Sequence, residues 1–268
     1  MTKDKVTVLD FKRKKEAGEK ITMLTAYDHL MARIIDRSGL DAILVGDSVG
    51  MVMLGYDNTT SVTMDEMIHH SKAVRKGTER AFLIGDMPFM SYQASDEDAV
   101  RNAGRFVQEA GCEAVKVEGG REALPRVEAI IAAGIPVLGH IGLTPQSLNK
   151  LGGYRVQGRD SDSAAQLMED AVLLEKAGCF ALVLECVPKD LAGKVARKLR
   201  VPVIGIGAGV HCDGQVLVTH DIIGYFDRFV PKFVKQYTKV NEVIGEAVAK
   251  FKRETESGEF PGDEQSFD

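Results

Sequence analysis

The sequence predicts an α/β fold, a (β/α)8 or TIM barrel, formed by a single domain over residues 1–268. Three observations indicate it. A chain of 268 residues with 44% hydrophobic content can bury a large core, and α/β barrels reach this length as one domain. Short β-rich runs recur along the chain, and amphipathic helical stretches lie between them. So many strand–helix units suit a closed barrel better than an open sheet.

Seven apolar runs are predicted to be strands. Most are continuous rather than alternating, which is typical of parallel strands that are covered on both faces. They span residues 21–27, 42–47, 81–86, 114–118, 136–140, 181–185 and 202–206. An eighth strand is needed to close the barrel, and we expect it between residues 227 and 237.

Helices are expected between the strands, for example over residues 99–110, 121–133 and 163–177. A glycine follows several of them, as is common just after the last helical position. Residues 1–20 form an N-terminal extension with a helix over 7–17, and residues 257–268 form a Gly- and Pro-containing tail. Before that tail, a closing helix carries an apolar stripe. The stripe consists of Val240, Val243, Ile244, Ala247, Val248 and Phe251.

Composition excludes several classes of protein. The formal net charge is −5, and the Lys and Arg residues are scattered, so nucleic acid is not an expected partner. Residues 1–20 lack the apolar region of a secretory signal, and no apolar run is long enough to span a membrane. The four cysteines have no C-x-x-C spacing, which favours buried free thiols over disulfides or a zinc site. We therefore expect a cytoplasmic protein without a nucleic-acid or membrane partner.

Three of the predicted strands end on a carboxylate: Asp47, Asp86 and Glu118. If the strands are parallel neighbours about 5 Å apart, the three acids meet at one edge of the sheet. Two unpaired charges about 4 Å apart repel by about 4 kcal/mol near a protein surface, so the cluster needs a cation, a proton or a basic partner. Hard oxygen ligands favour Mg²⁺, or Mn²⁺ and similar ions, over zinc. The alternative is that the acids cap helices or pair with Lys and Arg.

Other polar residues are expected at the same edge, where the active sites of such barrels lie. Lys116 shares a strand face with Glu118, and it either balances the acids or holds an anionic substrate. Glu185 ends an apolar run and is a candidate general base, with a helix cap or a salt bridge as the alternative. Ser48 follows Asp47 directly. His140 is interpreted as a ligand, a base or a core residue, and the sequence leaves these open.

Seven motifs resemble the ketopantoate hydroxymethyltransferase family, and the resemblance extends over residues 21–262. They are LVGDS at 44–48, GDMPFM at 85–90, VKVEGG at 115–120, GHIGLTPQS at 139–147, GGYRVQG at 152–158, LECVP at 184–188 and GIGAG at 205–209. The resemblance implies a barrel of the phosphoenolpyruvate/pyruvate superfamily. It also implies Mg²⁺, transfer of a hydroxymethyl group from 5,10-methylenetetrahydrofolate to 3-methyl-2-oxobutanoate, and a homodecamer.

The resemblance also assigns roles to residues of this chain. The family's metal positions fall on Asp47, Asp86 and Glu118. Its substrate contacts fall on Asp47, Ser48, Asp86 and Lys116, and its proton acceptor falls on Glu185. No residue is assigned to the folate.

Two positions depart from the family pattern. Tyr56 and Gln265 stand where family members often carry histidine, which puts a role of those histidines in lid closure or subunit contact in doubt. Two other functions are alternatives: a related metal-dependent 2-oxo acid lyase, and a non-catalytic metabolite-binding barrel scaffold. Loss of a metal acid, Lys116 or Glu185 would favour the scaffold, and none of these residues is lost.

Overall fold

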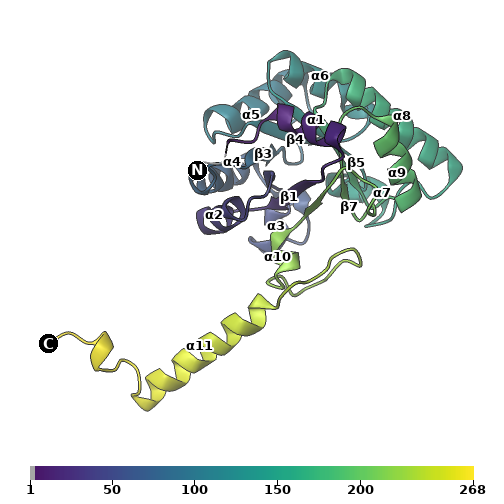
Figure 1. The fold of residues 1–268 in the computed structure, drawn as a ribbon. Helices are drawn as coiled ribbons and strands as arrows, with labels where there is room; N and C mark the ends of the chain where they lie inside the picture. Colours follow the sequence, from purple (N-terminus) through teal and green to yellow (C-terminus); the bar gives the residue numbers. More distant parts are fainter. Residues whose placement is uncertain (1–3) are drawn as a thin grey trace. The chain divides into compact units, whose positions relative to one another are not determined.

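The computed structural model describes residues 4–268, and its strands form a closed parallel barrel in the order β1 to β8 (Figure 1). The (β/α)8 prediction is therefore confirmed. The strands are β1 (Ile21–Thr25), β2 (Ala42–Val45), β3 (Phe82–Asp86), β4 (Ala114–Glu118), β5 (Val137–Gly142), β6 (Ala181–Glu185), β7 (Val203–Ile206) and β8 (Gly214–Leu217). The seven strands expected from apolar runs all form, with shifts of one to two residues at some ends.

Helices that connect successive strands lie around the outside of the barrel (Figure 1). The α-helices are α1 (Val8–Ala17), α2 (His29–Arg37), α3 (Val49–Val52), α4 (Met64–Gly77), α5 (Asp96–Gln108), α6 (Leu124–Ala132), α7 (Leu148–Leu151), α8 (Ser161–Ala177), α9 (Lys189–Lys198), α10 (Thr219–Ile222) and α11 (Val240–Ser257). Short 3-10 turns are η1 (Thr59–Ser61), η2 (Arg121–Ala123), η3 (Pro145–Ser147) and η4 (Asp263–Gln265).

The expected position of the eighth strand was wrong. Residues 227–237 contain no strand. β8 lies earlier in the sequence, and in the barrel it pairs with β7 on one side and β1 on the other. Its four residues include Gly214 and the exposed Gln215, so the apolar signal is weak. A Cβ on Gly214 would lie 2.4 Å from the carbonyl oxygen of Ile21, so close strand pairing requires glycine there. Pairing from both sides compensates for the low strand propensity.

The apolar strands divide their side chains between two hydrophobic layers. On β2, for example, Ala42 and Leu44 face the barrel interior, whereas Ile43 and Val45 pack against the outer helices. This two-sided burial explains why the strands read as continuous apolar runs. It also means that alternate residues near a strand's end share the inner face.

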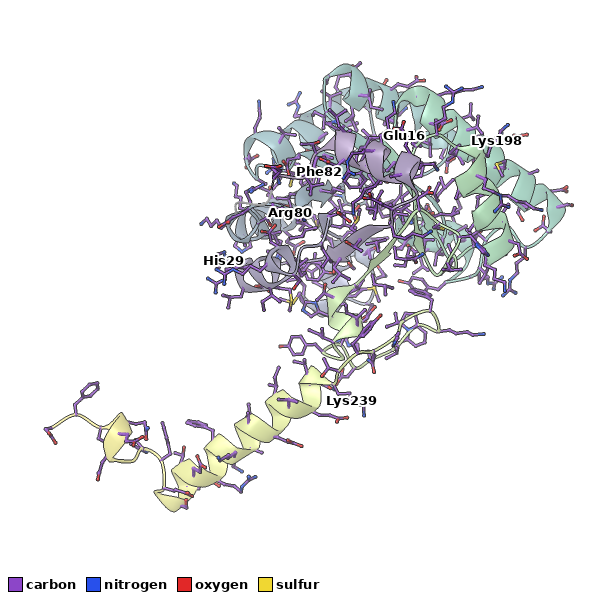
Figure 2. All side chains as sticks on the ribbon, viewed as in Figure 1. Glu16, His29, Arg80, Phe82, Lys198 and Lys239 are labelled. Carbon is purple, nitrogen blue, oxygen red and sulfur yellow. The ribbon has the colours of Figure 1, made fainter. Side chains whose placement is uncertain are left out.

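Helix α1 closes the amino-terminal end of the barrel, and it confirms the helix expected over residues 7–17. The ring of Phe11 lies 5.5 Å from that of Phe82 and 5.3 Å from that of Phe180, measured between ring centroids. Phe82 is labelled among the side chains of Figure 2. Thr7 caps the helix in a reciprocal capping box with Asp10. Residues 1–3 of the expected extension lie outside the described residues. With this end closed by aromatic rings, polar chemistry is left to the carboxyl end.

The described chain divides into two compact units, one extending to Val218 and the other spanning Thr219–Asp268. The second unit contains α10, α11 and η4. Helix α11 carries the expected apolar stripe, and none of its residues is buried. A single domain over residues 1–268 stays a prediction. Within residues 4–268, no helix is long and apolar enough to cross a membrane. The four cysteines are free thiols, as expected, and all except the partly exposed Cys186 are buried.

Candidate active site

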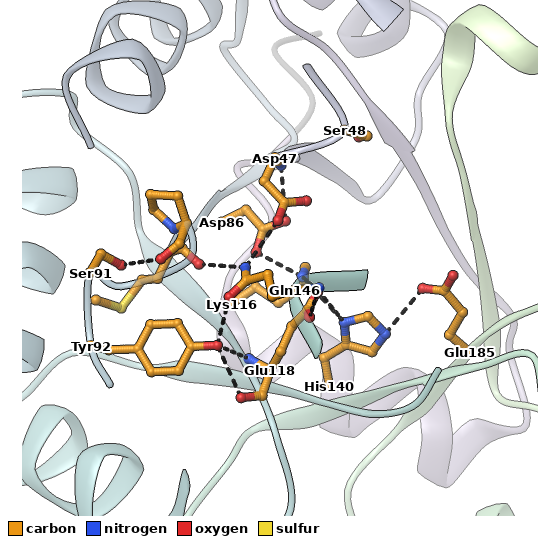
Figure 3. A network of polar contacts seen from close by, with 12 residues as sticks. Asp47, Ser48, Asp86, Ser91, Tyr92, Lys116, Glu118, His140, Gln146 and Glu185 are labelled. Atoms are coloured by element: carbon orange, nitrogen blue, oxygen red, sulfur yellow. Dashed lines mark hydrogen bonds and ion pairs between the residues drawn. The ribbon is translucent and has the colours of Figure 1, made fainter. Parts of the chain in front are cut away.

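The acids predicted from the strand ends lie together at the carboxyl end of the barrel (Figure 3). Asp86 and Glu118 are the last residues of β3 and β4, and Asp47 follows β2 by two residues. The backbone N–H of Asp47 donates a hydrogen bond of 3.1 Å to Asp86 Oδ2. All three side chains are buried, with at most 5% of each residue exposed. The predicted convergence of the three acids is therefore present in the structure.

Lys116 lies among these acids. Its Nζ is 2.7 Å from Asp86 Oδ1 and 3.3 Å from Glu118 Oε1, which makes two buried ion pairs. Burial alone would lower the pKa of Lys116, but the surrounding carboxylates raise it above its usual value, so the side chain is charged. The sequence allows two roles for Lys116, balancing the acids or holding an anionic substrate. These ion pairs show the first of them directly.

One lysine does not neutralise three acids. Burial, followed by repulsion from Asp86 and Glu118, raises the pKa of Asp47 well above its usual value, although Lys116 opposes the shift. Burial also raises the pKa of Asp86. For Glu118, Lys116 and then His140 overcome the effect of burial, and its pKa falls to about 2. The cluster therefore lacks positive charge near Asp47.

This donor set fits a hard divalent cation. Asp47, Asp86 and Glu118 offer carboxylate oxygens, and an added positive charge would relieve the repulsion that raises the pKa of Asp47. Among residues 4–268, no group of three or more His, Cys, Asp or Glu side chains is already arranged as a metal cage. The ammonium group of Lys116 instead lies between two of the acids.

His140 links the acid cluster to Glu185. Its Nδ1 is 3.2 Å from Glu118 Oε1, and its Nε2 is 3.1 Å from Glu185 Oε2 (Figure 3). Burial and Lys116 oppose a charge on the ring, but Glu118 and Glu185 outweigh them and raise the pKa of His140 to about 9. The strand register explains the contacts. Glu118 on β4 lies opposite His140 on β5, and Glu185 on β6 lies opposite Gly142, two residues after His140 on the same strand. The sequence alone leaves the role of His140 open.

Ser48 lies at the same edge but has a different polar partner. Its Oγ is 2.7 Å from the hydroxyl of the buried Tyr27. The structure therefore joins Asp47, Asp86, Lys116 and Glu118 in one cluster, with Glu185 attached through His140, whereas Ser48 is held by a residue that follows β1.

Two residues of the network were missed from the sequence. Gln146, in η3, donates hydrogen bonds to Asp47 and Glu118, and the hydroxyl of Tyr92 lies 2.9 Å from Gln146 Oε1. Both residues lie in connections after strands rather than at strand ends. Tertiary contacts position these connections, so the pattern of apolar strands does not predict where the two side chains lie. The motif at 139–147 contains Gln146 and is the sequence feature that could have indicated this residue.

The GGYRVQG segment at residues 152–158 lies at this end of the barrel as well. The backbone N–H of Gln157 donates to the carbonyl oxygen of Cys186, the residue after Glu185, at 2.9 Å. The hydroxyl of Tyr154 is 3.7 Å from Met51 Sδ on α3. Burial, and then the charges of Glu185 and Asp47, raise the pKa of Tyr154. The segment thus connects the end of β6 with the helix that follows Asp47.

Solved structures with this fold include phosphonopyruvate hydrolase in complex with oxalate and Mg²⁺. It superposes with a TM-score of 0.64 at 13% identity and covers 94% of this chain and 88% of its own. A 2,3-dimethylmalate lyase of the PEP mutase/isocitrate lyase superfamily gives a TM-score of 0.61 at 15% identity, with 97% and 91% covered. At these identities the similarity concerns the fold alone.

Sequence relatives are much closer. The 3-methyl-2-oxobutanoate hydroxymethyltransferase of Syntrophomonas wolfei subsp. wolfei is 56% identical over 263 residues, which cover 98% of this chain and 95% of that protein. A protein of the same name from Moorella thermoacetica is 56% identical over 265 residues, covering 99% and 98%. The family model described as ketopantoate hydroxymethyltransferase matches residues 5–263. Because these matches span nearly the whole chain, the chain belongs to the ketopantoate hydroxymethyltransferase family.

Proposed function

We propose that this chain is a 3-methyl-2-oxobutanoate hydroxymethyltransferase. It transfers a hydroxymethyl group from 5,10-methylenetetrahydrofolate to 3-methyl-2-oxobutanoate and so forms ketopantoate (2-dehydropantoate) in pantothenate biosynthesis. Relatives with this enzyme name match the chain at 56% identity over nearly all of its length. The structural observation that supports the proposal is the continuous polar network from Asp47 to Glu185, because it joins the cluster of three acids to a candidate base.

The metal of this proposal is Mg²⁺, held by Asp47, Asp86 and Glu118. When bound, the ion acts as a Lewis acid that polarises the 2-oxo group of the substrate. Superfamily neighbours include one solved with Mg²⁺ and oxalate, a small dicarboxylate, which is consistent with this assignment. Asp47, Ser48, Asp86 and Lys116 contact the substrate, and Lys116 supplies positive charge for its anionic end.

The reaction begins with removal of the C3 proton of the 2-oxo acid. Glu185 accepts this proton, and His140 orients the carboxylate of Glu185 through their 3.1 Å contact. Lys116 stabilises the negative charge that develops on the enolate. The enolate carbon then forms a bond to the methylene carbon of the folate as the first of that carbon's two C–N bonds breaks. Water displaces the second nitrogen and supplies the oxygen of the new hydroxymethyl group, and tetrahydrofolate leaves with the protons on its nitrogens.

The setting of this activity is also part of the proposal. We place the enzyme in the cytoplasm as a homo-oligomer, a homodecamer by family resemblance. Exposed apolar residues on α11, such as Val248 and Phe251, supply a surface that assembly would bury.

Exchange of the C3 proton tests the proposal without folate. The protein is incubated with Mg²⁺ and 3-methyl-2-oxobutanoate in D₂O, and loss of the C3 proton signal is followed by NMR. We expect exchange in the wild type, and loss of exchange after chelation or in Glu185→Gln, which lacks a carboxylate to accept the proton. Undiminished exchange in Glu185→Gln would show that another group is the base.

Addition of 5,10-methylenetetrahydrofolate then distinguishes the reaction types. Ketopantoate is the expected product. Cleavage of an oxo acid without hydroxymethyl transfer would favour the lyase, and neither exchange nor product with folate present would favour the non-catalytic scaffold.

A further inference from the structure

We propose that Gln146 is a positioning residue that holds Asp47 and Glu118 in the arrangement required for the divalent ion, and thereby sets the affinity of the site for metal. This inference rests on the proposed function, because it assumes that these acids bind the ion. It concerns a residue outside the acids, lysine and base already assigned.

The side-chain amide of Gln146 is buried and has one defined orientation. Its Nε2 donates a hydrogen bond of 2.9 Å to Asp47 Oδ2 and another of 2.9 Å to the carbonyl oxygen of Met87. An amide nitrogen carries two hydrogens, so both are used. A flipped amide would place its oxygen against a carboxylate oxygen and a carbonyl oxygen, which is unfavourable. Only 5% of Gln146 is exposed, so water does not replace these partners.

The backbone of the same residue holds a second acid. The N–H of Gln146 donates to Glu118 Oε2 at 3.0 Å. One residue in the connection between β5 and α8 therefore contacts an acid that follows β2 and an acid that ends β4. Asp86, at the end of β3, lies on the strand between them. Because each carboxylate is fixed through one oxygen, the direction of its second oxygen is fixed as well.

Tyr92 holds the oxygen end of the Gln146 amide. Its hydroxyl lies 2.9 Å from Gln146 Oε1 and 3.0 Å from the backbone oxygen of Glu118 (Figure 3). The hydroxyl has one proton to share between these two acceptors, and it accepts a 3.3 Å hydrogen bond from the N–H of Glu118. Tyr92 is itself 3% exposed. Gln146 is thus locked at both ends of its amide.

A neutral donor is well suited to this position. Asp47 lies close to other carboxylates and would rotate away from them if its side chain were free. Gln146 holds it without adding a positive charge, so the need of the acids for a cation remains. Groups that orient metal ligands typically contribute 10- to 100-fold to metal affinity. A glutamine that serves only the packing of the core would not affect that affinity.

Metal titration of the metal-free protein tests this role. Binding of Mn²⁺, followed by electron paramagnetic resonance, reports occupancy without requiring turnover. We expect Gln146→Met to raise the dissociation constant by about 10- to 100-fold. Methionine has a similar length, and the backbone N–H to Glu118 is retained, so this variant removes only the amide. Gln166→Met, an exposed position on α8, is the matched control and is expected to bind as the wild type does.

Turnover provides a second measurement. If Gln146 acts through metal affinity, saturating Mg²⁺ restores most of the kcat of Gln146→Met, and the defect remains in the metal concentration needed for half-maximal activity. Gln146→Asn is a second variant, because it keeps an amide but withdraws it from Asp47 by one methylene. A folded Gln146→Asn with wild-type Mn²⁺ affinity overturns the proposal, whether or not Gln146→Met folds. Failure of the wild type to bind Mn²⁺ or Mg²⁺ would instead contradict the metal site itself.

Discussion

His140 is a buried residue whose charge depends on two glutamates, and this leads to a prediction about pH. Its pKa is raised to about 9, because the favourable effect of Glu118 and Glu185 exceeds the opposing effects of burial and Lys116. A raised pKa in the folded state stabilises the fold fully below the unfolded value near 6.5. That stabilisation is lost as pH rises through about 9. Its upper limit is about 3 kcal/mol in metal-free protein.

Urea unfolding of metal-free wild type and His140→Gln at several pH values measures this contribution. We expect the difference in free energy of unfolding between them to be largest at pH 6 and to shrink by pH 10. The variant serves as the control for other groups that titrate in this range. A difference that stays constant with pH would show that folding does not raise the pKa of the ring.

At this scale, part of the site could be predicted from the sequence. Asp47, Asp86, Lys116, Glu118 and Glu185 stand at the ends of apolar strands, so the strand pattern alone brings them to one edge. His140 could be placed there, but its two contacts depend on the register between β4, β5 and β6. Gln146 and Tyr92 could not be predicted, because long-range packing positions their loops.

Packing between β3 and α5 positions Asp86, and it yields a prediction at the scale of elements. Gly85 precedes Asp86 and faces Phe106 of α5, whose side chain is fully buried. A Cβ at Gly85 would meet Phe106 Cδ1 at 2.2 Å, so alanine requires the ring or the strand to move. We expect Gly85→Ala to lower the free energy of unfolding by about 1–3 kcal/mol.

A smaller side chain at position 106 tests whether the contact with the Phe106 ring is the cause. Combining Gly85→Ala with Phe106→Leu should cost less than the sum of the two single substitutions, as measured by urea unfolding in a double-mutant cycle. Gly104→Ala on α5 is the control. A Cβ there meets no atom within 4 Å, and alanine favours a helix, so we expect a gain of about 0.5–1 kcal/mol. Strictly additive losses would exclude Phe106 as the reason.

The same elements show why seven strands could be predicted and the eighth could not. Strands such as β2 bury side chains on both faces, so their sequences are continuous apolar runs that can be recognised. β8 is held by hydrogen bonds to β7 and β1 on either side, so Gly214 and Gln215 are tolerated. Barrel closure depends on the whole sheet, so the local pattern of apolar residues does not predict the closing strand.

At the scale of the whole molecule, α11 bears a surface that a single copy of the second unit leaves exposed. Val248 is 62% and Phe251 57% exposed, and Val243 and Ile244 extend the same stripe. Contiguous apolar patches of this kind mark interaction sites. If the protein is a homo-oligomer, as proposed, replacing Val248 and Phe251 together by serine should lower the mass of the particle in solution.

Light scattering coupled to size-exclusion chromatography measures that mass. Lys252→Ser, on the same helix and exposed, is the control and should leave the mass unchanged. Circular dichroism checks that the barrel remains folded in both variants. If the serine variant keeps the wild-type mass, α11 is not part of the contact that holds the oligomer together. If the wild type is itself a monomer, the proposed assembly is wrong, and the apolar stripe requires a different partner.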